Sequence, residues 1–372
     1  MTKSFLSPDL LGKFKNVVID EASMALLPSL YFTASQSEMR VIISGDFRQL
    51  PPIIKSRNRN ILDILENDIF SVSGTEEKFE KLIESSNLGI LRSQYRMDPK
   101  ICDLISEIGY SGELKTAQDR VVSNLESPEN FEASVILVDT SDFMPFAEPD
   151  LYNSTFNTTH ALIARNIIRT FISDRRFGSI GYCANFRAQV KVVKKMIEAD
   201  DPDKNVSVGT VHTFQGDERN TIIFDTVNSY GSNILSIPLQ HELPSKSNLI
   251  TVAVSRAQHR LIIIGNYEFL DKKIPAQGYL RKLLNKAETN GKIVNANKII
   301  DIAQLEAFEA QPNINIPQLQ KNIRSLGQTL LRGEDFYPSF FSAVESARRY
   351  ICIYSGFYTS RRVASVLPKL KQ

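Results

Sequence analysis

The chain has 372 residues, of which 42% are hydrophobic and 23% are charged, with 44 Lys and Arg against 42 Asp and Glu. This composition is typical of a folded protein and excludes a disordered or collagen-like chain. At about 150 residues per domain, the length predicts two or three domains. The net charge of +2 gives no basic field over the whole chain, so any contact with nucleic acid must come from local geometry.

No apolar run approaches the roughly 20 residues that are needed to span a bilayer, which argues against a membrane protein. The first residues, MTKSFLSPDLLGKFKN, lack the apolar core and cleavage site of a secretory signal. Cys102, Cys183 and Cys352 lie far apart and the chain has only four His, so neither a zinc site nor a disulfide framework is expected. We therefore expect a cytoplasmic protein in a reducing environment.

Short apolar runs alternate with amphipathic stretches, which predicts βαβ units around parallel sheets and an α/β fold class. Helical spacing of apolar residues predicts helices over residues 161–171 and 188–197. Strands are expected at residues 17–19, 41–43, 134–138, 178–182, 206–208, 221–224 and 261–264.

Changes in composition predict the domain organisation. A polar stretch over residues 71–87 places a domain boundary after residue 88, and residues 112–133 are expected to form a loop or small insertion. Residues 285–330 are rich in Asn, Gln and Lys and are expected to form a helical linker. A renewed helix and strand pattern predicts a short α/β unit over residues 331–372.

Two adjacent carboxylates, Asp20 and Glu21, follow the first predicted strand. Ligands of an open parallel sheet lie beyond the carboxyl ends of the strands, so both side chains are placed to meet one. One carboxylate can hold Mg²⁺ while the other orients or deprotonates a water. Acids after a buried strand occur in many α/β folds, however, and the pair alone does not establish a site.

The second predicted strand runs into GDFRQLPP at residues 45–52. The two prolines force an extended segment, so Gln49 projects from a rigid loop, where its neutral amide can bind a phosphate oxygen or a water. Further on, QYRMDP at residues 94–99 leads into a helix that Asp98 can cap. Tyr95 offers a stacking face there, and Arg96 offers a guanidinium fork for phosphate.

Two later segments carry similar chemistry. TVHTFQGDE at residues 210–218 brings hydroxyls and a glycine amide, which suit a sugar–phosphate backbone. VAVSRAQ at residues 252–258 places Arg256 among small residues, where it fits an arginine finger that stabilises charge on a transferred phosphoryl group. For each segment taken alone, an ordinary solvated loop or helix is the alternative.

Together and in this order, the five segments resemble the superfamily 1 helicases of the Upf/Nam group, from residue 17 to about residue 266. VVIDEAS resembles the Walker B segment, GDFRQLPP motif III, QYRMDP the motif that opens the second RecA-like domain, TVHTFQGDE motif V and VAVSRAQ motif VI. The resemblance implies RecA-like parallel sheets with flanking helices: a partial first RecA-like domain over residues 1–88 and a complete second one over residues 89–284. It further implies ATP and Mg²⁺ between the two domains and single-stranded DNA or RNA across their top, with movement that is typically 5′ to 3′.

The resemblance also implies roles for individual residues. Asp20 would bind Mg²⁺, and Tyr95, Gly216 and Glu218 would border the nucleotide, with Tyr95 near the adenine and Glu218 near the ribose. The residues implied in catalysis are Glu21, which would activate the attacking water, Gln49, which would contact the γ-phosphate or that water, and Arg96 and Arg256, which would reach the γ-phosphate. Thr213 would touch the backbone of the nucleic acid.

Some positions depart from the family's pattern. Asp98 stands where His is common, His212 where Asp is usual, and His160 where Glu is usual. A larger departure is the P-loop GxxxxGK[ST], whose amides and Lys hold the phosphates, because the sequence contains no Gly-Lys-Ser or Gly-Lys-Thr. We therefore expect the chain to lack most of the first RecA-like domain and to need a P-loop segment, in cis or in trans.

The tail carries a weaker resemblance. The sequence FFSAVESARRYICIYSGF at residues 340–357 is similar to the opening of a phospholipase D-like domain. Such domains act through an HxK motif, but none of the four His in this chain is followed by Lys two positions on. A packed α/β accessory unit is the alternative.

The sequence thus predicts the C-terminal motor portion of an ATP-dependent DNA or RNA helicase, inactive alone because the P-loop is absent. The alternative is a catalytically dead module that binds nucleic acid or a partner. Against this alternative, Asp20, Glu21, Gln49, Arg96 and Arg256 are all present, and a dead site has no chemical reason to keep five interlocking groups.

Overall fold

The computed structural model describes residues 12–301, 303 and 304, apart from gaps at residues 53, 55–57, 59–61, 63–64, 66, 82–86, 122–124, 151, 203–204, 215 and 233–243. The chain divides into two compact units, Met1–Ala307 and Phe308–Gln372, and every described residue belongs to the first. The expected α/β unit over residues 331–372, with its resemblance to phospholipase D-like domains, lies outside the described residues and stays a prediction.

A small sheet comes first in the chain. It consists of two parallel strands, β1 (Phe14–Ile19) and β2 (Ser37–Ile43), joined through η2 (Ala22–Met24) and α2 (Leu27–Ala34). Both strands were expected from their apolar runs. Buried Ile19, Ala22 and Leu30 form the core beneath the sheet, and α4 (Ile69–Val72) and α5 (Thr75–Glu80) follow in the chain.

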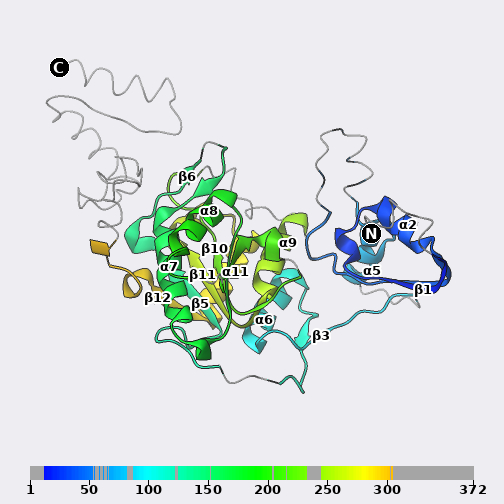
Figure 1. The fold of residues 1–372 in the computed structure, drawn as a ribbon, viewed down its shortest axis with the longest axis horizontal. Coiled ribbons are helices and arrows are strands. Elements are labelled where there is room, and N and C mark those ends of the chain that lie inside the picture. The colour runs from blue at the N-terminus through cyan, green and yellow to red at the C-terminus, as the bar shows by residue number, and fades with distance from the viewer. Residues whose placement is uncertain are drawn as a thin grey trace, which may run out of the picture. The chain divides into compact units, whose positions relative to one another are not determined.

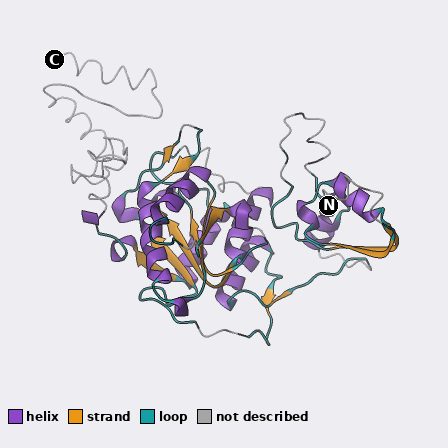
Figure 2. Cartoon of the chain, viewed as in Figure 1, coloured by secondary structure: helices purple, strands orange, loops and turns teal. Residues whose placement is uncertain are grey.

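A larger sheet of six parallel strands has the order β12-β5-β11-β10-β8-β9. Figure 1 labels four of these strands, β5, β10, β11 and β12, and Figure 2 shows the strands in orange between purple helices. Its strands are rich in Val and Ile because a parallel sheet is buried on both faces. The five strands expected between residues 134 and 264 are all present. The bounds are β5 (Val135–Asp139), β8 (Ile180–Ala184), β9 (Ser207–Thr210), β10 (Arg219–Asp225), β11 (Ala257–Gly265) and β12 (Lys292–Asn295).

Helices cover both faces of the six-stranded sheet. On one face, α6 (Pro99–Gly109), α9 (Pro244–Ser255) and α11 (Tyr279–Asn290) share an apolar core with Leu137 and Ile222. On the other face lie α7 (Thr158–Ile172) and α8 (Arg187–Ile197), both expected from their periodicity, and side chains of both bind Asp225 of β10. The sequence pattern therefore yields the three-layer α/β arrangement that was predicted.

The start of α6 forms as the sequence predicted. Asp98 Oδ1 accepts a hydrogen bond from the backbone N–H of Lys100 (2.9 Å), and Pro99 occupies the first helical position. Ile101 and Ile105 are fully buried behind them. The remaining elements are β3 (Ser93–Gln94), β4 (Lys115–Thr116), η3 (Ser141–Phe143), β6 (Glu148–Pro149), β7 (Thr155–Phe156), η4 (Arg175–Phe177), η5 (Val211–Phe214), α10 (Tyr267–Lys273) and η7 (Ala296–Lys298).

The six-stranded sheet continues beyond residue 284, where a linker was expected to begin. β12 pairs with β5 along its whole length, and its Val294 is buried in the sheet. The Asn- and Lys-rich composition around β12 suggested a linker because a short edge strand needs only one or two apolar residues. In the described part of the chain, no helix is long and apolar enough to cross a membrane.

Candidate active site

Asp20 and Glu21 directly follow β1, at the carboxyl end of the small sheet. The backbone N–H of Ser44 donates to the carbonyl of Ile19 (2.8 Å), and the N–H of Ala22 donates to the carbonyl of Ser44 (2.9 Å). These bonds tie the exit of β1 to the exit of β2. Glu21 adopts a left-handed backbone conformation (φ 51°, ψ 40°), which is uncommon for a residue other than glycine and is often found at functional sites.

Gly45 allows the two exits to approach each other. A Cβ at this position would lie 3.0 Å from both the backbone nitrogen of Ala22 and the ring of Phe70. Any larger residue would therefore push the loop at residues 45–52 away from the carboxylates. Asp20 and Glu21 are both exposed. An exposed carboxylate pair suits Mg²⁺, which binds through one or two carboxylates together with substrate phosphates.

Asp46 organises the loop that carries Gln49. Its Oδ1 accepts from the backbone N–H of Arg48 (2.9 Å), and its Oδ2 accepts from Nε2 of Gln49 (3.0 Å). The hydroxyl of Tyr110, which caps the end of α6, donates to the same Oδ2 (2.5 Å). Burial and then the negative charge of Asp46 raise the pKa of Tyr110 well above its usual value, so the phenol stays protonated and remains a donor.

Gln49 joins this loop to the segment that precedes β11. With its amide nitrogen bound to Asp46, Gln49 presents Oε1 to Arg256, whose Nη2 donates to it (2.7 Å). Arg256 is only 2% exposed, and its Nε has no hydrogen-bond partner. Burial, followed by the positive charge of Arg96, lowers the pKa of Arg256, while Glu21 acts in the opposite direction. The structure therefore brings together Gln49, Arg96 and Arg256, which the family resemblance assigned to the γ-phosphate.

Arg96 makes an ion pair with Glu218, with Nε 2.6 Å from Oε2. The other carboxylate oxygen of Glu218 accepts from Nε2 of Gln258 (2.7 Å), and the backbone carbonyl of Gln258 accepts from the N–H of Asp98 (2.7 Å). These bonds connect the segments that resemble the second-domain opening motif, motif V and motif VI.

A cavity of about 400 Å³ borders the Arg96–Glu218 ion pair. Tyr95, which is 60% exposed, lies on the wall of this cavity together with both partners of the pair. Tyr95, Glu218 and Arg96, assigned to the adenine, the ribose and the γ-phosphate, thus share one cavity, whereas Gln49 and Arg256 do not line it. An exposed aromatic face beside charged groups is suited to stack on a base.

Glu218 and Arg256 lie at the amino ends of their strands rather than at the carboxyl ends. Arg219 of β10 is in register with Ala257 of β11, and its N–H donates to the carbonyl of Arg256 (3.0 Å). The carboxyl-end rule therefore holds for Asp20 and Gln49 in the small sheet but not for these two residues. In the larger sheet these two residues come from the segments that enter β10 and β11.

Thr213 lies in η5, just beyond the carboxyl end of the edge strand β9. Thr210 ends β9 in register with Ala184, and its hydroxyl shares a 3.1 Å hydrogen bond with that of Thr213. A Cβ at Gly209 would lie 2.9 Å from Cβ of Thr213, so only glycine permits this packing. Thr213 is exposed, and Gly216 has a left-handed backbone (φ 82°) in the loop that leads on to Glu218. The segment that resembles motif V thus runs from the carboxyl end of β9 to the amino end of β10.

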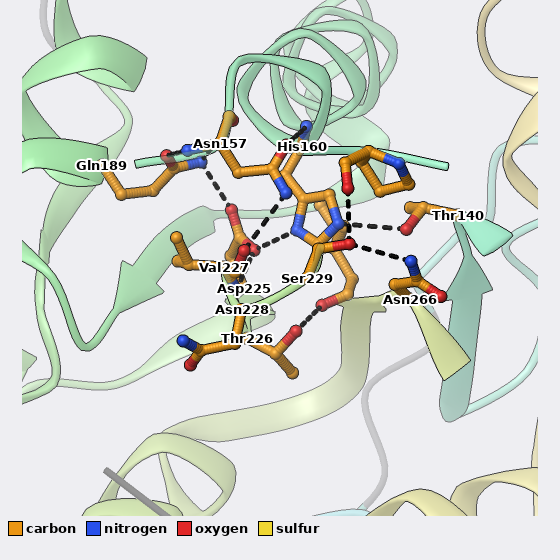
Figure 3. A network of polar contacts seen from close by, with 12 residues as sticks. Thr140, Asn157, His160, Gln189, Asp225, Thr226, Val227, Asn228, Ser229 and Asn266 are labelled. Carbon is orange, nitrogen blue, oxygen red and sulfur yellow. Dashed lines mark hydrogen bonds and ion pairs between the residues drawn. The ribbon is translucent and has the colours of Figure 1, made fainter. Parts of the chain in front are cut away.

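His160, which departs from the family's pattern, belongs to a buried polar network (Figure 3). Its Nδ1 lies 2.8 Å from Oδ1 of Asp225, and its Nε2 lies 3.0 Å from the hydroxyl of Thr140. Asp225 also accepts from the hydroxyl of Tyr182 (2.6 Å) and the amide of Gln189 (2.8 Å). All these polar groups are buried and satisfied, so His160 has a structural role beside the larger sheet.

The same network holds a strained turn. Val227 has a φ of 64°, a genuine outlier for a β-branched residue, and its N–H donates to Oδ1 of Asp225 (2.8 Å). The carbonyl of Val227 accepts from the side chain of Asn157, which caps α7 (3.1 Å). The Asp225 network therefore fixes the path of the chain where it leaves β10.

Several residues of the site were not singled out by the sequence. Asp46 and Gln258 lie inside quoted motifs, but only the folded contacts show what they bind. Tyr110 could be noticed as an aromatic residue at the end of a helix that contains no other aromatic residue. Arg120, which lines the cavity beside Arg96, sits in a stretch that looked like a loop and carries no signal of its own.

Comparisons with known proteins identify the family of this chain. A family model described as an AAA domain matches residues 75–268, more than half of the chain, and a second model with the same description matches residues 3–57. The chain belongs to the AAA-domain family. Within this family its matches to curated helicases support a superfamily 1 helicase of the Upf-like group.

Two curated relatives illustrate the similarity of this AAA-domain chain. The DNA polymerase alpha-associated DNA helicase A of Saccharomyces cerevisiae is 27% identical over 279 residues, covering 70% of the chain and 39% of the relative. The ATP-dependent helicase upf1 of Schizosaccharomyces pombe is 26% identical over 276 residues, covering 70% and 27%. The chain spans well under half the length of these relatives. The solved helicase of an arterivirus, nonstructural protein 10, matches with a TM-score of 0.33 at 15% identity over 71% of the chain and 42% of that protein.

Proposed function

We propose that the chain is the motor portion of an ATP-dependent helicase, which couples ATP hydrolysis to movement along single-stranded DNA or RNA, in the 5′ to 3′ direction. The observation that carries this proposal is the contact between Gln49 and Arg256, which are 207 positions apart in sequence and 2.7 Å apart in space. The nearby charges of Arg96 and Glu21 affect Arg256 as well. Residues that stabilise and orient a phosphoryl group are expected to converge in this way.

The roles follow from these positions. Tyr95 and Glu218 bind the adenosine end of ATP in their shared cavity, and Arg96 and Arg256 offset the charge that develops on the γ-phosphate. Asp20 would hold Mg²⁺, which would neutralise part of the negative charge on the phosphates. Glu21 orients and deprotonates the attacking water, and Gln49 holds that water or the γ-phosphate. Thr213 binds the backbone of the single strand.

The proposal includes a P-loop from a RecA-like segment that is supplied in cis or in trans. The 372 residues contain no GxxxxGK[ST] motif, so their own backbone offers no amide cradle of this kind for the β- and γ-phosphates. β1 and β2 leave apolar side chains in solvent, with Val18 65% and Ile42 54% exposed. Parallel sheets are normally buried on both faces and contain more than two strands. These exposed side chains support the packing of further strands, including the P-loop strand, against the small sheet.

The names of the curated relatives include a DNA helicase and an ATP-dependent helicase. We therefore propose either DNA or RNA as the single strand that this chain binds.

We place the chain in a reducing compartment, the cytoplasm. Cys102 and Cys183 are free thiols, and burial raises the pKa of both, so neither is poised to form a disulfide.

Unwinding of forked substrates tests the proposal. The 372-residue chain is fused to, or mixed with, a RecA-like segment that carries a P-loop, and it is assayed on DNA and RNA forks with either a 5′ or a 3′ single-stranded tail. ATP-dependent unwinding from the 5′ tail is expected, and Glu21→Gln, which keeps the shape but removes the base, should abolish it. If the parent protein and Glu21→Gln unwind or fail to unwind equally on every fork, the proposed motor function is wrong.

A further inference from the structure

Arg120 lines the cavity that Tyr95, Arg96 and Glu218 share. None of the five helicase-like motifs contains it, and the family models do not assign roles to single residues. Its position in the wall nevertheless places a third charged group beside the Arg96–Glu218 ion pair. Arg120 can therefore contact whatever binds in this cavity.

Arg120 is anchored by only one of its three nitrogen atoms. Nη2 donates to the backbone carbonyls of Arg96 (3.1 Å) and Gln258 (3.3 Å). These bonds hold the guanidinium between the segment that carries Arg96 and the one that follows Arg256. Because both acceptors are backbone atoms, the anchor fixes the guanidinium without neutralising it.

The other two nitrogens, Nε and Nη1, are buried and have no hydrogen-bond partner. A buried donor that is left unsatisfied is costly, and a charged one is more costly still. Within the described residues, no carboxylate pairs with Arg120. Two donors of a charged fork on the cavity wall are therefore left unsatisfied, and an acceptor in the cavity reaches them once the atoms that cover them shift.

The charges around the cavity favour an anionic acceptor. The carboxylate of Glu218 is already matched by Arg96. Burial, followed by the positive charges of Arg120 and Arg260, lowers the pKa of His259 on the same wall, so the imidazole is neutral at pH 7. Arg120 thus leaves one positive charge without a counterpart at this position. A guanidinium with two free N–H groups matches a phosphate oxygen pair better than it matches a sugar or a base.

We propose that Arg120 is a nucleotide-binding residue, whose Nε and Nη1 donate to a phosphate oxygen of ATP or ADP in this cavity. This inference rests on the nucleotide site that we propose for the chain. It adds a phosphate contact made from the segment between α6 and β5. The two carbonyl bonds of Nη2 hold the fork in position before the nucleotide arrives, which reduces the entropy lost on binding.

The proposal is tested by titrating the 372-residue chain with MgADP and, separately, with adenosine. Binding is monitored by saturation-transfer NMR, which detects weak ligands. Adenosine is the control ligand, because it has the base and the ribose of ADP but no phosphates. Arg120→Met, which keeps the aliphatic stem, should weaken MgADP binding about tenfold or more and leave adenosine binding unchanged. Arg120→Lys should recover part of the MgADP affinity at low salt, because it keeps the charge but not the fork. Arg92→Met, which removes a guanidinium paired with Glu113 away from the cavity, is the control and should bind both ligands as the parent does.

The outcomes separate this inference from the site on which it rests. Tyr95→Ala should weaken the binding of both MgADP and adenosine, because both contain the adenine base. If the parent chain binds neither ligand, the proposed nucleotide site is wrong, and so is the proposed role of Arg120. If the parent binds both and responds to Tyr95→Ala, then an unchanged affinity in Arg120→Met, or an equal loss for adenosine and MgADP, overturns the phosphate contact alone. Equal melting temperatures of the parent and Arg120→Met chains exclude misfolding as the cause of a loss.

Discussion

Arg256 and Gln49 are joined by a 2.7 Å hydrogen bond from Nη2 to Oε1, although Gln49 lies in the loop after β2 of the small sheet and Arg256 directly precedes β11 of the larger sheet. The bond places an almost fully buried guanidinium against the loop that leaves β2, close enough to Glu21 for the two charges to interact. Because the guanidinium is held in place, it can stabilise the negative charge that develops on a phosphoryl group during transfer.

Substitution of Arg256 should therefore lower turnover far more than it lowers binding. In the chain supplied with a P-loop segment, Arg256→Ala should reduce the turnover number for ATP by about 10³-fold, with little change in ATP affinity. Arg256→Lys should not restore activity, because a point charge lacks the planar fork. Arg176→Ala removes an exposed arginine that pairs with Asp174, and it serves as the control. Steady-state kinetics within a few-fold of the parent for both Arg256 variants would remove this assignment.

Tyr110 should influence turnover through Asp46 and Gln49. Tyr110→Phe removes the 2.5 Å bond to Asp46 and loosens the loop that orients the Gln49 amide. We expect the turnover number to fall about tenfold, with the KM for ATP changing less than about twofold. Because Tyr110 acts through Asp46, Tyr110→Phe combined with Asp46→Asn should cost no more than Asp46→Asn alone.

Tyr267→Phe is the matched control for that cycle. Tyr267 also donates to a carboxylate at 2.5 Å, that of Glu288, but it lies on α10 away from the site. Its loss should leave ATP turnover unchanged. Additive effects of the Tyr110 and Asp46 substitutions would show that the two residues act separately.

Binding to single strands should depend on few phosphate contacts. The chain has a net charge of only +2, and Thr213 offers a hydroxyl rather than a charge. The plot of log binding constant against log salt should therefore have a slope smaller in magnitude than about 3. Thr213→Val should weaken binding about fivefold to tenfold, whereas Thr170→Val on α7 should have no effect. A steep salt slope together with an unaffected Thr213→Val variant would place the binding surface elsewhere.

His160 should matter for stability. His160→Ala would leave Asp225 buried with one partner fewer and would open a cavity beside it, which should cost about 3 kcal/mol. For a domain of this size we expect the melting temperature to fall by roughly 6–12 °C. His212→Ala, at an exposed position, should melt within about 1–2 °C of the parent. Equal melting temperatures for the parent and His160→Ala would contradict the structural role of the network.

Much of the fold could be predicted because parallel strands buried on both faces are unbroken apolar runs. Ile222 and Ile262 belong to such runs, and the Asp98-Pro99 pair marks the start of α6 with little ambiguity. β12 was missed because it is a short edge strand with only two apolar residues, Ile293 and Val294. Its surroundings therefore resembled a linker in composition.

The site could be predicted only as far as its motifs reach. The residue types at Asp20, Gln49 and Arg256 indicate phosphoryl transfer, but the bonds from Tyr110 to Asp46 and from Arg120 to two backbone carbonyls depend on long-range packing. No local pattern encodes the approach of two segments that are far apart in sequence. His160 illustrates the reverse case, because a departure within a family-like segment proved to belong to a buried network.

The most direct test of the whole account is steady-state ATP hydrolysis by the purified 372-residue chain in the presence of single-stranded DNA or RNA. Positioning supplies most of the catalysis of phosphoryl transfer, and these residues contain no P-loop to fix the β- and γ-phosphates in line with the water at Glu21. We therefore predict no turnover above background for the chain alone, and single-strand-stimulated turnover once a P-loop segment is added in cis or in trans. Turnover by the chain alone near about 1 s⁻¹, on the order typical of working enzymes, and abolished by Glu21→Gln, would contradict the account, as would the absence of any ATPase activity after the P-loop segment is added.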